Sequence, residues 1–418
     1  MSAHPREAIA GLARCHHGSL SSAELERLYL SPEAVVDFSV NTNPLGPSPA
    51  VAEALSRVAI PRYPDDEATQ LRRLLALRHD VAVDNVVVGN GSVELIRLAA
   101  LAYVSPGDVV LIFSPTFGEY EVASRIMGGQ VLLLGSQKSR LSGVAGECVI
   151  LSPPQADEES RHTGAETLRY ALRRSPESFG QGDSFAQSLN GFQESLSFEL
   201  DVDTALAAIS SCSPKVVFLC NPNNPTGTYL AREAVEDVVR AAEGSLVVVD
   251  EAYVNFVENA WPSEHLIRRP NVLLLRSMTK DYALTGLRIG YGLAGAQVVD
   301  ALEKVRPPWN VNAFAQAAAI ASLGDGEHLA RSRRQVDAAK RFLADELSHL
   351  GFVVVPSRAN FLLVRVGDAT SFRLALLRQG LCVRDCTSFG LPEYVRLGVR
   401  TLPECRQLLA TVREVLRS

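Results

Sequence analysis

Short apolar runs alternate with longer helical patterns over most of the chain. Helical patterns cover, for example, residues 92–104 and 232–243. The runs between such patterns are apolar on both faces, as expected for parallel strands that helices cover on either side; they span residues 85–88, 108–113, 130–134, 215–219, 245–249 and 271–275. Because this alternation is typical of right-handed crossover units, we expect an α/β fold with a mainly parallel sheet.

The pattern changes in the last quarter of the chain. A long polar helix is predicted over residues 325–350 and is followed by candidate strands near 361–364 and 395–399 and a last helix over 404–416. This mixture indicates a smaller α+β domain. We therefore predict three parts. Residues 1–47 form an N-terminal arm that packs on the small domain and the active site, residues 48–305 form a large domain, and residues 306–418 form a small C-terminal domain.

Residues 155–198 differ from the rest of the large domain. They are polar and rich in Ser, Gln and Gly, a composition that is hard to pack. We expect a surface insertion around one short helix over residues 167–174. A plain loop and a regulatory or partner-binding segment both fit this composition.

Composition excludes several classes of protein. The 418 residues carry a net charge of -6 with both signs interspersed, so neither nucleic acid nor a membrane is expected as a partner. The seven cysteines are scattered and odd in number, which argues against a disulfide framework and against a metal site. The first residues carry charges without a following apolar segment, so we expect a cytoplasmic protein.

Polar clusters follow four of the candidate strands directly. In an open parallel sheet, ligands bind along the edge formed by the carboxyl ends of the strands. Residues 89–94 combine glycines with a helix start, where free amides attract a phosphate, although an ordinary strand–helix turn fits them equally well. Residues 220–227 form a proline-rich turn that would aim Asn224 into the crevice.

The third cluster supplies a carboxylate and a phenol. Asp250 and Tyr253 follow the apolar run 245–249, and a carboxylate in such a setting needs a partner. The protonated pyridine nitrogen of pyridoxal 5'-phosphate (PLP) would be one, because an ionised Asp250 keeps that nitrogen charged. A helix-capping role fits Asp250 when it is considered alone.

The fourth cluster supplies a lysine. Lys280 follows the run 271–275 and Ser277, and Arg288 comes eight residues later. Lys280 could bind PLP covalently while the hydroxyl and the guanidinium hold its phosphate. A lone lysine is usually a surface charge, but the order of the four clusters predicts a PLP enzyme that acts on an amino acid.

This order resembles the fold-type I PLP enzymes of the aminotransferase class I and II family, over nearly the whole chain apart from the insertion. The resemblance implies that Lys280 is the covalent and acid–base residue and that Asp250 pairs with the pyridine nitrogen. It also implies that Asn224 and Tyr253 bond the phenolic oxygen. The remaining cofactor contacts that it implies are Gly91, Ser92, Val93, Ser277 and Arg288 around the phosphate, and Phe117, whose ring would stack on the cofactor.

The same resemblance implies contacts to substrate and to a second subunit. Tyr63 resembles a tyrosine that reaches the phosphate of the neighbouring subunit, which implies a homodimer. Arg396 resembles the arginine that forks onto the substrate α-carboxylate. The other candidate substrate contacts are Asn43, Arg358, Arg384 and Arg400, and a structural salt bridge fits each of these arginines equally well.

Two subgroups of the family compete for the reaction. Residues 37–46, 308–312 and 357–360 resemble the L-threonine O-3-phosphate decarboxylases of cobalamin side-chain synthesis. Residues 284–292 and 388–392 resemble the histidinol-phosphate aminotransferases instead. The N-terminal motif favours decarboxylation of a phosphorylated amino acid. The alternative is amino transfer from a phosphorylated amine to 2-oxoglutarate, and a non-catalytic PLP-binding protein is a remote third.

Overall fold

The computed structural model describes residues 3–12, 15, 18, 20–135 and 198–417. The predicted insertion lies outside these residues apart from Phe198, and so does the helix predicted within it. None of the described helices is both long and apolar enough to cross a membrane. The cytoplasmic location stays a prediction.

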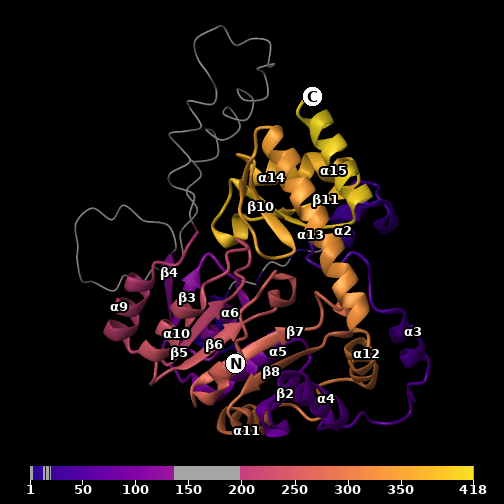
Figure 1. The fold of residues 1–418 in the computed structure, drawn as a ribbon. Coiled ribbons are helices and arrows are strands. Elements are labelled where there is room, and N and C mark those ends of the chain that lie inside the picture. Colours follow the sequence, from indigo (N-terminus) through magenta and orange to yellow (C-terminus); the bar gives the residue numbers. More distant parts are fainter. Residues whose placement is uncertain (1–2, 13–14, 16–17, 19, 136–197, 418) are drawn as a thin grey trace.

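A seven-stranded sheet forms the centre of the larger part of the molecule (Figure 1). Its strands lie in the order β2-β8-β7-β6-β5-β3-β4, with β8 antiparallel to both neighbours and the other pairings parallel. The strands are β2 (Val86–Gly89), β3 (Val109–Ser114), β4 (Gln130–Gly135), β5 (Val216–Cys220), β6 (Leu246–Asp250), β7 (Val272–Ser277) and β8 (Gly290–Ala294). This arrangement confirms the mainly parallel sheet, and each of the six runs expected in it forms a strand.

Strand β8 is the one strand of the large sheet that the apolar pattern did not predict. It contains two glycines and no β-branched residue, so its propensity for a strand is low. Gly290 is needed there because a Cβ at this position would lie 2.7 Å from the amide nitrogen of Ser92. Tertiary packing therefore decides this strand.

Both faces of the sheet are buried, as the apolar runs indicated. Val110 and Ile112 on β3 face one core, whereas Leu111 between them faces the other, because successive side chains on a strand alternate. The first core includes residues of α5 (Ser92–Tyr103), α6 (Glu119–Ile126) and α11 (Ala296–Val305). The second includes residues of α4 (Thr69–His79), α9 (Val202–Cys212), α10 (Arg232–Ala241) and α12 (Ala313–Leu323).

The small domain has its own antiparallel sheet. Its strands lie in the order β12 (Arg384–Asp385), β13 (Tyr394–Gly398), β10 (Phe361–Arg365) and β9 (Val353–Val355). They share a core with helices α13 (Gly326–His349), α14 (Ala369–Arg378) and α15 (Leu402–Val415). In Figure 1, α13 runs from the neighbourhood of α12 up to this sheet. The domain boundaries stay a prediction, and the packing of α12 in the core of the large sheet favours a boundary near residue 325 over one at 306.

The N-terminal segment lies against both parts. Within it, helices α1 (Glu7–Ala10) and α2 (Ser22–Arg27) precede β1 (Val36–Asp37), which pairs in parallel with β11 (Leu381–Cys382) of the small domain; α3 (Pro49–Ser56) comes after it. Between β1 and α3, the carbonyl oxygen of Phe38 accepts a hydrogen bond from the amide of Gly398 at 2.7 Å. A few residues later, the amide of Asn43 donates to the carbonyl of Lys280 at 2.8 Å. The segment between these two contacts thus joins the small sheet to the turn that carries Lys280.

Candidate active site

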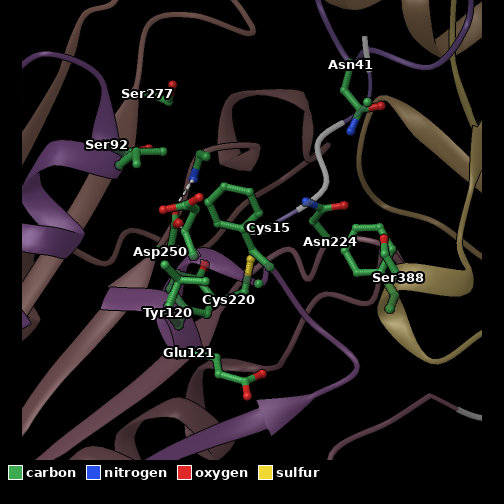
Figure 2. A pocket seen from close by; sticks show the side chains of 18 of the residues that line it. Cys15, Asn41, Ser92, Tyr120, Glu121, Cys220, Asn224, Asp250, Ser277 and Ser388 are labelled. Atoms are coloured by element: carbon green, nitrogen blue, oxygen red, sulfur yellow. Dashed lines mark hydrogen bonds between the residues drawn. The ribbon is translucent and has the colours of Figure 1, made fainter. Parts of the chain in front are cut away.

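A cavity of about 870 Å³ lies at the carboxyl ends of the parallel strands. Cys220, Asp250 and Ser277, which end β5, β6 and β7, line it together with the start of α5. Arg384 and Arg396 line it from the small domain. In Figure 2, Ser277 and Ser92 lie on the left with Asp250 and Tyr120 below them, and Asn41 and Asn224 lie on the right.

A buried carboxylate lies on the large-sheet side of this cavity. Asp250 is 4% exposed, and its Oδ2 accepts a hydrogen bond from the hydroxyl of Tyr120 at 2.8 Å. Its Oδ1 accepts one from the amide of Ala252 at 3.0 Å. Burial raises the pKa of Asp250 to about 6, although the Tyr120 hydroxyl acts to lower it. A cation in the cavity would stabilise the ionised form.

Lys280 lies three residues beyond the end of β7 and lines the same cavity. Burial of its ammonium group lowers the pKa of Lys280 to about 8, and the positive charges of Arg396 and Arg288 lower it further, while Asp250 acts to raise it. A lysine with this pKa has a substantial neutral fraction near physiological pH. Only the neutral amine can attack a carbonyl carbon or accept a proton.

The start of α5 forms a site suited to an anion. Gly91 is its N-cap, and a glycine supplies no side chain to bond the free amides of the first turn. Gly91 has a φ of 79°, and a Cβ there would lie 2.9 Å from Nη2 of Arg288, so glycine lets the guanidinium approach. Arg288 itself has a φ of 59°, a strained conformation that is often found at functional sites. Ser92, Val93 and Ser277 line the cavity beside it.

Asn224 and Tyr253 lie on the side of the cavity that meets the small domain. Oδ1 of Asn224 accepts a hydrogen bond from Nη1 of Arg396, and the Tyr253 hydroxyl accepts one from Nδ2 of Asn41 at 3.2 Å. Nη2 of Arg396 also donates to the carbonyl of Ser39 at 2.8 Å. Arg396 is 5% exposed and therefore has a fixed orientation.

Arg384 is the second cavity arginine of the small domain. It lies opposite Arg396 in the register of β12 and β13. Its Nη2 donates to Oγ of Ser388 at 2.7 Å, and its guanidinium carbon lies 5.3 Å from the centre of the Phe389 ring. Burial and the neighbouring charge of Arg396 lower the pKa of Arg384. Two positively charged arginines this close together would favour an anionic ligand.

Most of the predicted site residues lie together around this cavity. Those that line it are Ser92, Val93, Phe117, Asn224, Asp250, Tyr253, Ser277, Lys280, Arg288, Arg384 and Arg396. Gly91 is not among the lining residues but adjoins Arg288.

Three predicted substrate contacts have their side chains bonded away from the cavity. Nδ2 of Asn43 donates to the carbonyl of Asp281 at 2.9 Å, so Asn43 holds the turn beside Lys280 rather than lining the cavity. Nη2 of Arg358 donates to the carbonyl of Glu258 at 2.5 Å. Arg400 forms a salt bridge with Glu404 at 2.7 Å. None of these three residues lines the cavity, and their contact with substrate stays a prediction.

Tyr63 also lies outside the lining of the cavity. It is 80% exposed, and its ring stacks on that of Trp309 with the ring centres 4.6 Å apart. A contact from Tyr63 to a neighbouring subunit therefore stays a prediction.

Sequence reasoning missed two polar residues that shape the cavity. Tyr120 bonds Asp250, and Asn41 bonds Tyr253. Tyr120 lies three residues after Phe117, and Asn41 lies two residues before Asn43; the resemblance had singled out Phe117 and Asn43. No local signal singled out Tyr120, because Phe117 precedes α6 and Tyr120 lies in the first turn of that helix.

The chemical groups around the cavity fit PLP. Oδ1 of Asn41 and Nε of Arg396 are buried without a hydrogen-bond partner among the described residues. Because buried polar atoms are nearly always bonded, a polar ligand accounts for both. A buried carboxylate, a lysine with a lowered pKa and an uncapped helix start match a pyridine nitrogen, an aldehyde and a phosphate. Within the described residues, no group of three His, Cys, Asp or Glu side chains could hold a metal ion.

Comparison with known proteins shows the family. The model of the family described as aminotransferase class I and II matches residues 33–139 and 191–412. The histidinol-phosphate aminotransferase of Moorella thermoacetica is 31% identical over 427 residues, which cover 98% of this chain and 95% of the relative. That of Symbiobacterium thermophilum is 34% identical over 390 residues, which cover 91% of each chain.

Solved structures show the same fold. The histidinol-phosphate aminotransferase of Sinorhizobium meliloti in complex with PLP matches with a TM-score of 0.77 at 21% identity, over 100% of this chain and 98% of that one. The L-threonine-O-3-phosphate decarboxylase of Porphyromonas gingivalis matches with a TM-score of 0.69 at 22% identity, over 92% of this chain and 100% of that one. The chain therefore belongs to the aminotransferase class I and II family and is a PLP-dependent enzyme of fold type I.

Proposed function

We propose that this enzyme is an aminotransferase of the histidinol-phosphate type, which moves the amino group of a phosphorylated amine to 2-oxoglutarate. The observation that carries this proposal is the similarity to relatives of that name, at 31–34% identity over 91–98% of the chain. The N-terminal motif had favoured a decarboxylase, and the relatives support the aminotransferase alternative better.

The proposed chemistry depends on the residues around the cavity. PLP, when bound, withdraws electrons from the substrate carbon next to the nitrogen. Asp250 would keep the pyridine nitrogen protonated, and Asn224 and Tyr253 would bond the phenolic oxygen. Lys280 would hold the cofactor covalently between turnovers. Once displaced by substrate, its neutral amine would be the base that accepts the proton from that carbon and the acid that donates it again.

The phosphate of the cofactor would lie at the start of α5. There the amides of Ser92 and Val93, the hydroxyl of Ser277 and the guanidinium of Arg288 would bind it. The absence of a side chain at Gly91 leaves room for Arg288. Phe117 would stack on the pyridine ring.

The two arginines of the small domain would hold the anionic groups of the substrates. Arg396 would bind the α-carboxylate of 2-oxoglutarate or glutamate as a fork, since its Nε is still unbonded. Arg384, on the neighbouring strand, would bind the phosphate of the amine. We also propose a homodimer in which the exposed Tyr63 reaches the neighbouring active site.

A phosphothreonine decarboxylase is the second candidate, because the motif at residues 37–46 resembles that subgroup and its Asn41 lines the cavity. One experiment separates the two. PLP-loaded protein is incubated with histidinol phosphate and 2-oxoglutarate while glutamate is measured, and separately with L-threonine O-3-phosphate without an oxo acid while carbon dioxide is measured. Sustained formation of glutamate supports the proposal. Sustained release of carbon dioxide without glutamate formation would replace it with the decarboxylase.

A further inference from the structure

A buried charged cluster lies behind the strand ends that carry Asp250 and Lys280. Glu251 follows Asp250, and Arg276 precedes Ser277. Because successive side chains on a strand point to opposite faces, Glu251 and Arg276 point away from the cavity, and neither lines it. They are 1% and 8% exposed.

Arg276 makes several contacts in this cluster. Its Nε donates to Oε2 of Glu251 at 2.7 Å, and its Nη2 donates to Oγ of Ser263 at 3.0 Å and lies 3.4 Å from Oε1 of Glu264. Ser263 in turn donates to Oε2 of Glu251 at 2.8 Å. One guanidinium therefore joins the end of β6, the end of β7 and the short helix η7 (Glu264–Arg268).

The cluster continues to a fourth and a fifth element. Oε1 of Glu264 lies 2.9 Å from Nδ1 of His79, and Nε2 of His79 lies 2.8 Å from the hydroxyl of Tyr291. Burial lowers the pKa of His79, and the hydrogen bond with His79 is the main reason that the pKa of Glu264 falls to about 2. With a neutral His79, two carboxyl groups thus face one guanidinium, and burial raises the pKa of Glu251 although Arg276 acts to lower it.

The cluster acts on the cavity through the charge of Glu251, which is one of the causes that raise the pKa of its neighbour Asp250. The amide of Glu251 also donates to the carbonyl of Leu275 at 2.8 Å, so the ends of β6 and β7 are bonded next to the site. At the outer end of the cluster, the charges of Arg78 and Asp281 act in opposite directions on the pKa of Tyr291.

We propose that Arg276 is a positioning residue of the PLP site, which holds the ends of β6 and β7 in register and neutralises Glu251 behind Asp250. This inference rests on the proposed roles of Asp250 and Lys280. Arg276 touches neither cofactor nor substrate in this proposal. It acts through charge as well as through contacts, and the charge effect is what distinguishes it from a purely structural salt bridge.

The charge effect can be measured on four proteins, namely the wild type, Arg276→Met, Glu251→Gln and the double variant. Each is loaded with PLP, and the pH at which the absorbance of the lysine-bound cofactor changes is determined. Arg276→Met makes the cluster more negative and should raise this pH, by about half a unit or more, whereas Glu251→Gln should lower it. The double variant restores the net charge and should return to within about 0.3 units of the wild type.

Two further measurements accompany the titration. The affinity of the PLP-free protein for PLP, followed by quenching of tryptophan fluorescence, should fall by about tenfold in Arg276→Met because the register of β6 and β7 loosens. The matched control is Arg373→Met, which breaks the partly buried salt bridge between Arg373 of the small domain and Glu24 of the N-terminal segment. This control should leave both the titration and the affinity unchanged.

The proposal is overturned if the single variants shift the titration in the same direction, or by no more than Arg373→Met does. Glu251→Gln and the double variant carry the same test if Arg276→Met does not fold. Lys280→Ala should abolish the lysine-bound absorbance altogether. A wild-type protein without such absorbance would overturn the proposed role of Lys280 and this inference with it.

Discussion

The hydroxyl of Tyr120 donates a hydrogen bond to Oδ2 of Asp250 at 2.8 Å, and both side chains are buried. This bond stabilises the ionised carboxylate against the effect of burial, which raises its pKa to about 6. Tyr120→Phe removes the hydroxyl while keeping the ring that stacks on Phe218. The pKa of Asp250 should then rise further, and Asp250 should become a weaker partner for a pyridinium.

We expect Tyr120→Phe to lower kcat by about tenfold, the usual cost of a hydrogen bond to a charged group. PLP affinity should also fall, while thermal unfolding changes little. Tyr103→Phe is the control, because Tyr103 lies at the far end of α5 and does not line the cavity. Equal kinetics for Tyr120→Phe and Tyr103→Phe would show that the hydroxyl has no role in the reaction.

Asp250 should make the PLP-free protein less stable at neutral pH. Its pKa in the folded state is about 6, above the ordinary value of 3.8 for an aspartate, so the unfolded chain binds fewer protons between these values. Stability therefore falls as pH rises from about 4 to 6 and stays lower above that range. Asp250→Asn should stabilise the PLP-free protein by about 1–2 kcal/mol at pH 7 and by nothing near pH 3.5.

Thermal unfolding of the PLP-free wild type and Asp250→Asn at both pH values checks this expectation. The variant should also bind PLP far more weakly, because the partner of the pyridine nitrogen is lost. A variant that is less stable than the wild type at pH 7 would contradict the sign of the effect.

The arginines should separate into two groups in kinetics. Arg384→Gln is expected to raise KM for the phosphorylated amine by about tenfold or more, since a charge-assisted bond to phosphate is lost. Arg358→Gln and Arg400→Gln are matched controls and should change KM by less than about twofold, because these side chains bond Glu258 and Glu404 outside the cavity. A large effect of either control on KM would restore it as a substrate contact.

Gly91 should be sensitive to a single methyl group. Alanine at this position meets Arg288 at 2.9 Å and is strained at a φ of 79°. We expect Gly91→Ala to weaken PLP binding by about tenfold, equivalent to about 1.4 kcal/mol. Gly244→Ala is the control, because nothing lies within 4 Å of a Cβ there. Unchanged PLP affinity in Gly91→Ala would remove Gly91 from the proposed phosphate site.

Much of the fold follows from local patterns. Apolar runs predict β5, β6 and β7, and the convergence of parallel strand ends explains why Asn224, Asp250 and Lys280 could be expected in one place. The spacing of residues could not show which arginines face the cavity. Arg384 meets Arg396 through strand register, whereas Arg400, four residues after Arg396, follows the strand end and bonds Glu404.

The bond between Tyr120 and Asp250 was also beyond local patterns. It joins residues 130 apart in sequence and depends on how α6 packs on the face of the large sheet. Strand β8 forms despite its glycines because it pairs with β2 and β7 on either side, and the close approach of Ser92 requires the glycine at position 290. In both cases tertiary contact outweighs local propensity.

The segment between Phe38 and Asn43 has a consequence for how the protein is made. Ser39 bonds Arg396, 357 residues later, and Asn43 bonds Asp281, 238 residues later. Contacts between such distant residues form slowly. Residues 38–43 must therefore wait until the ribosome has made residue 396 before they reach all of their native partners. The complete cavity, and with it the chance to capture cofactor tightly, arises only after the strand that carries Arg396 has been synthesised.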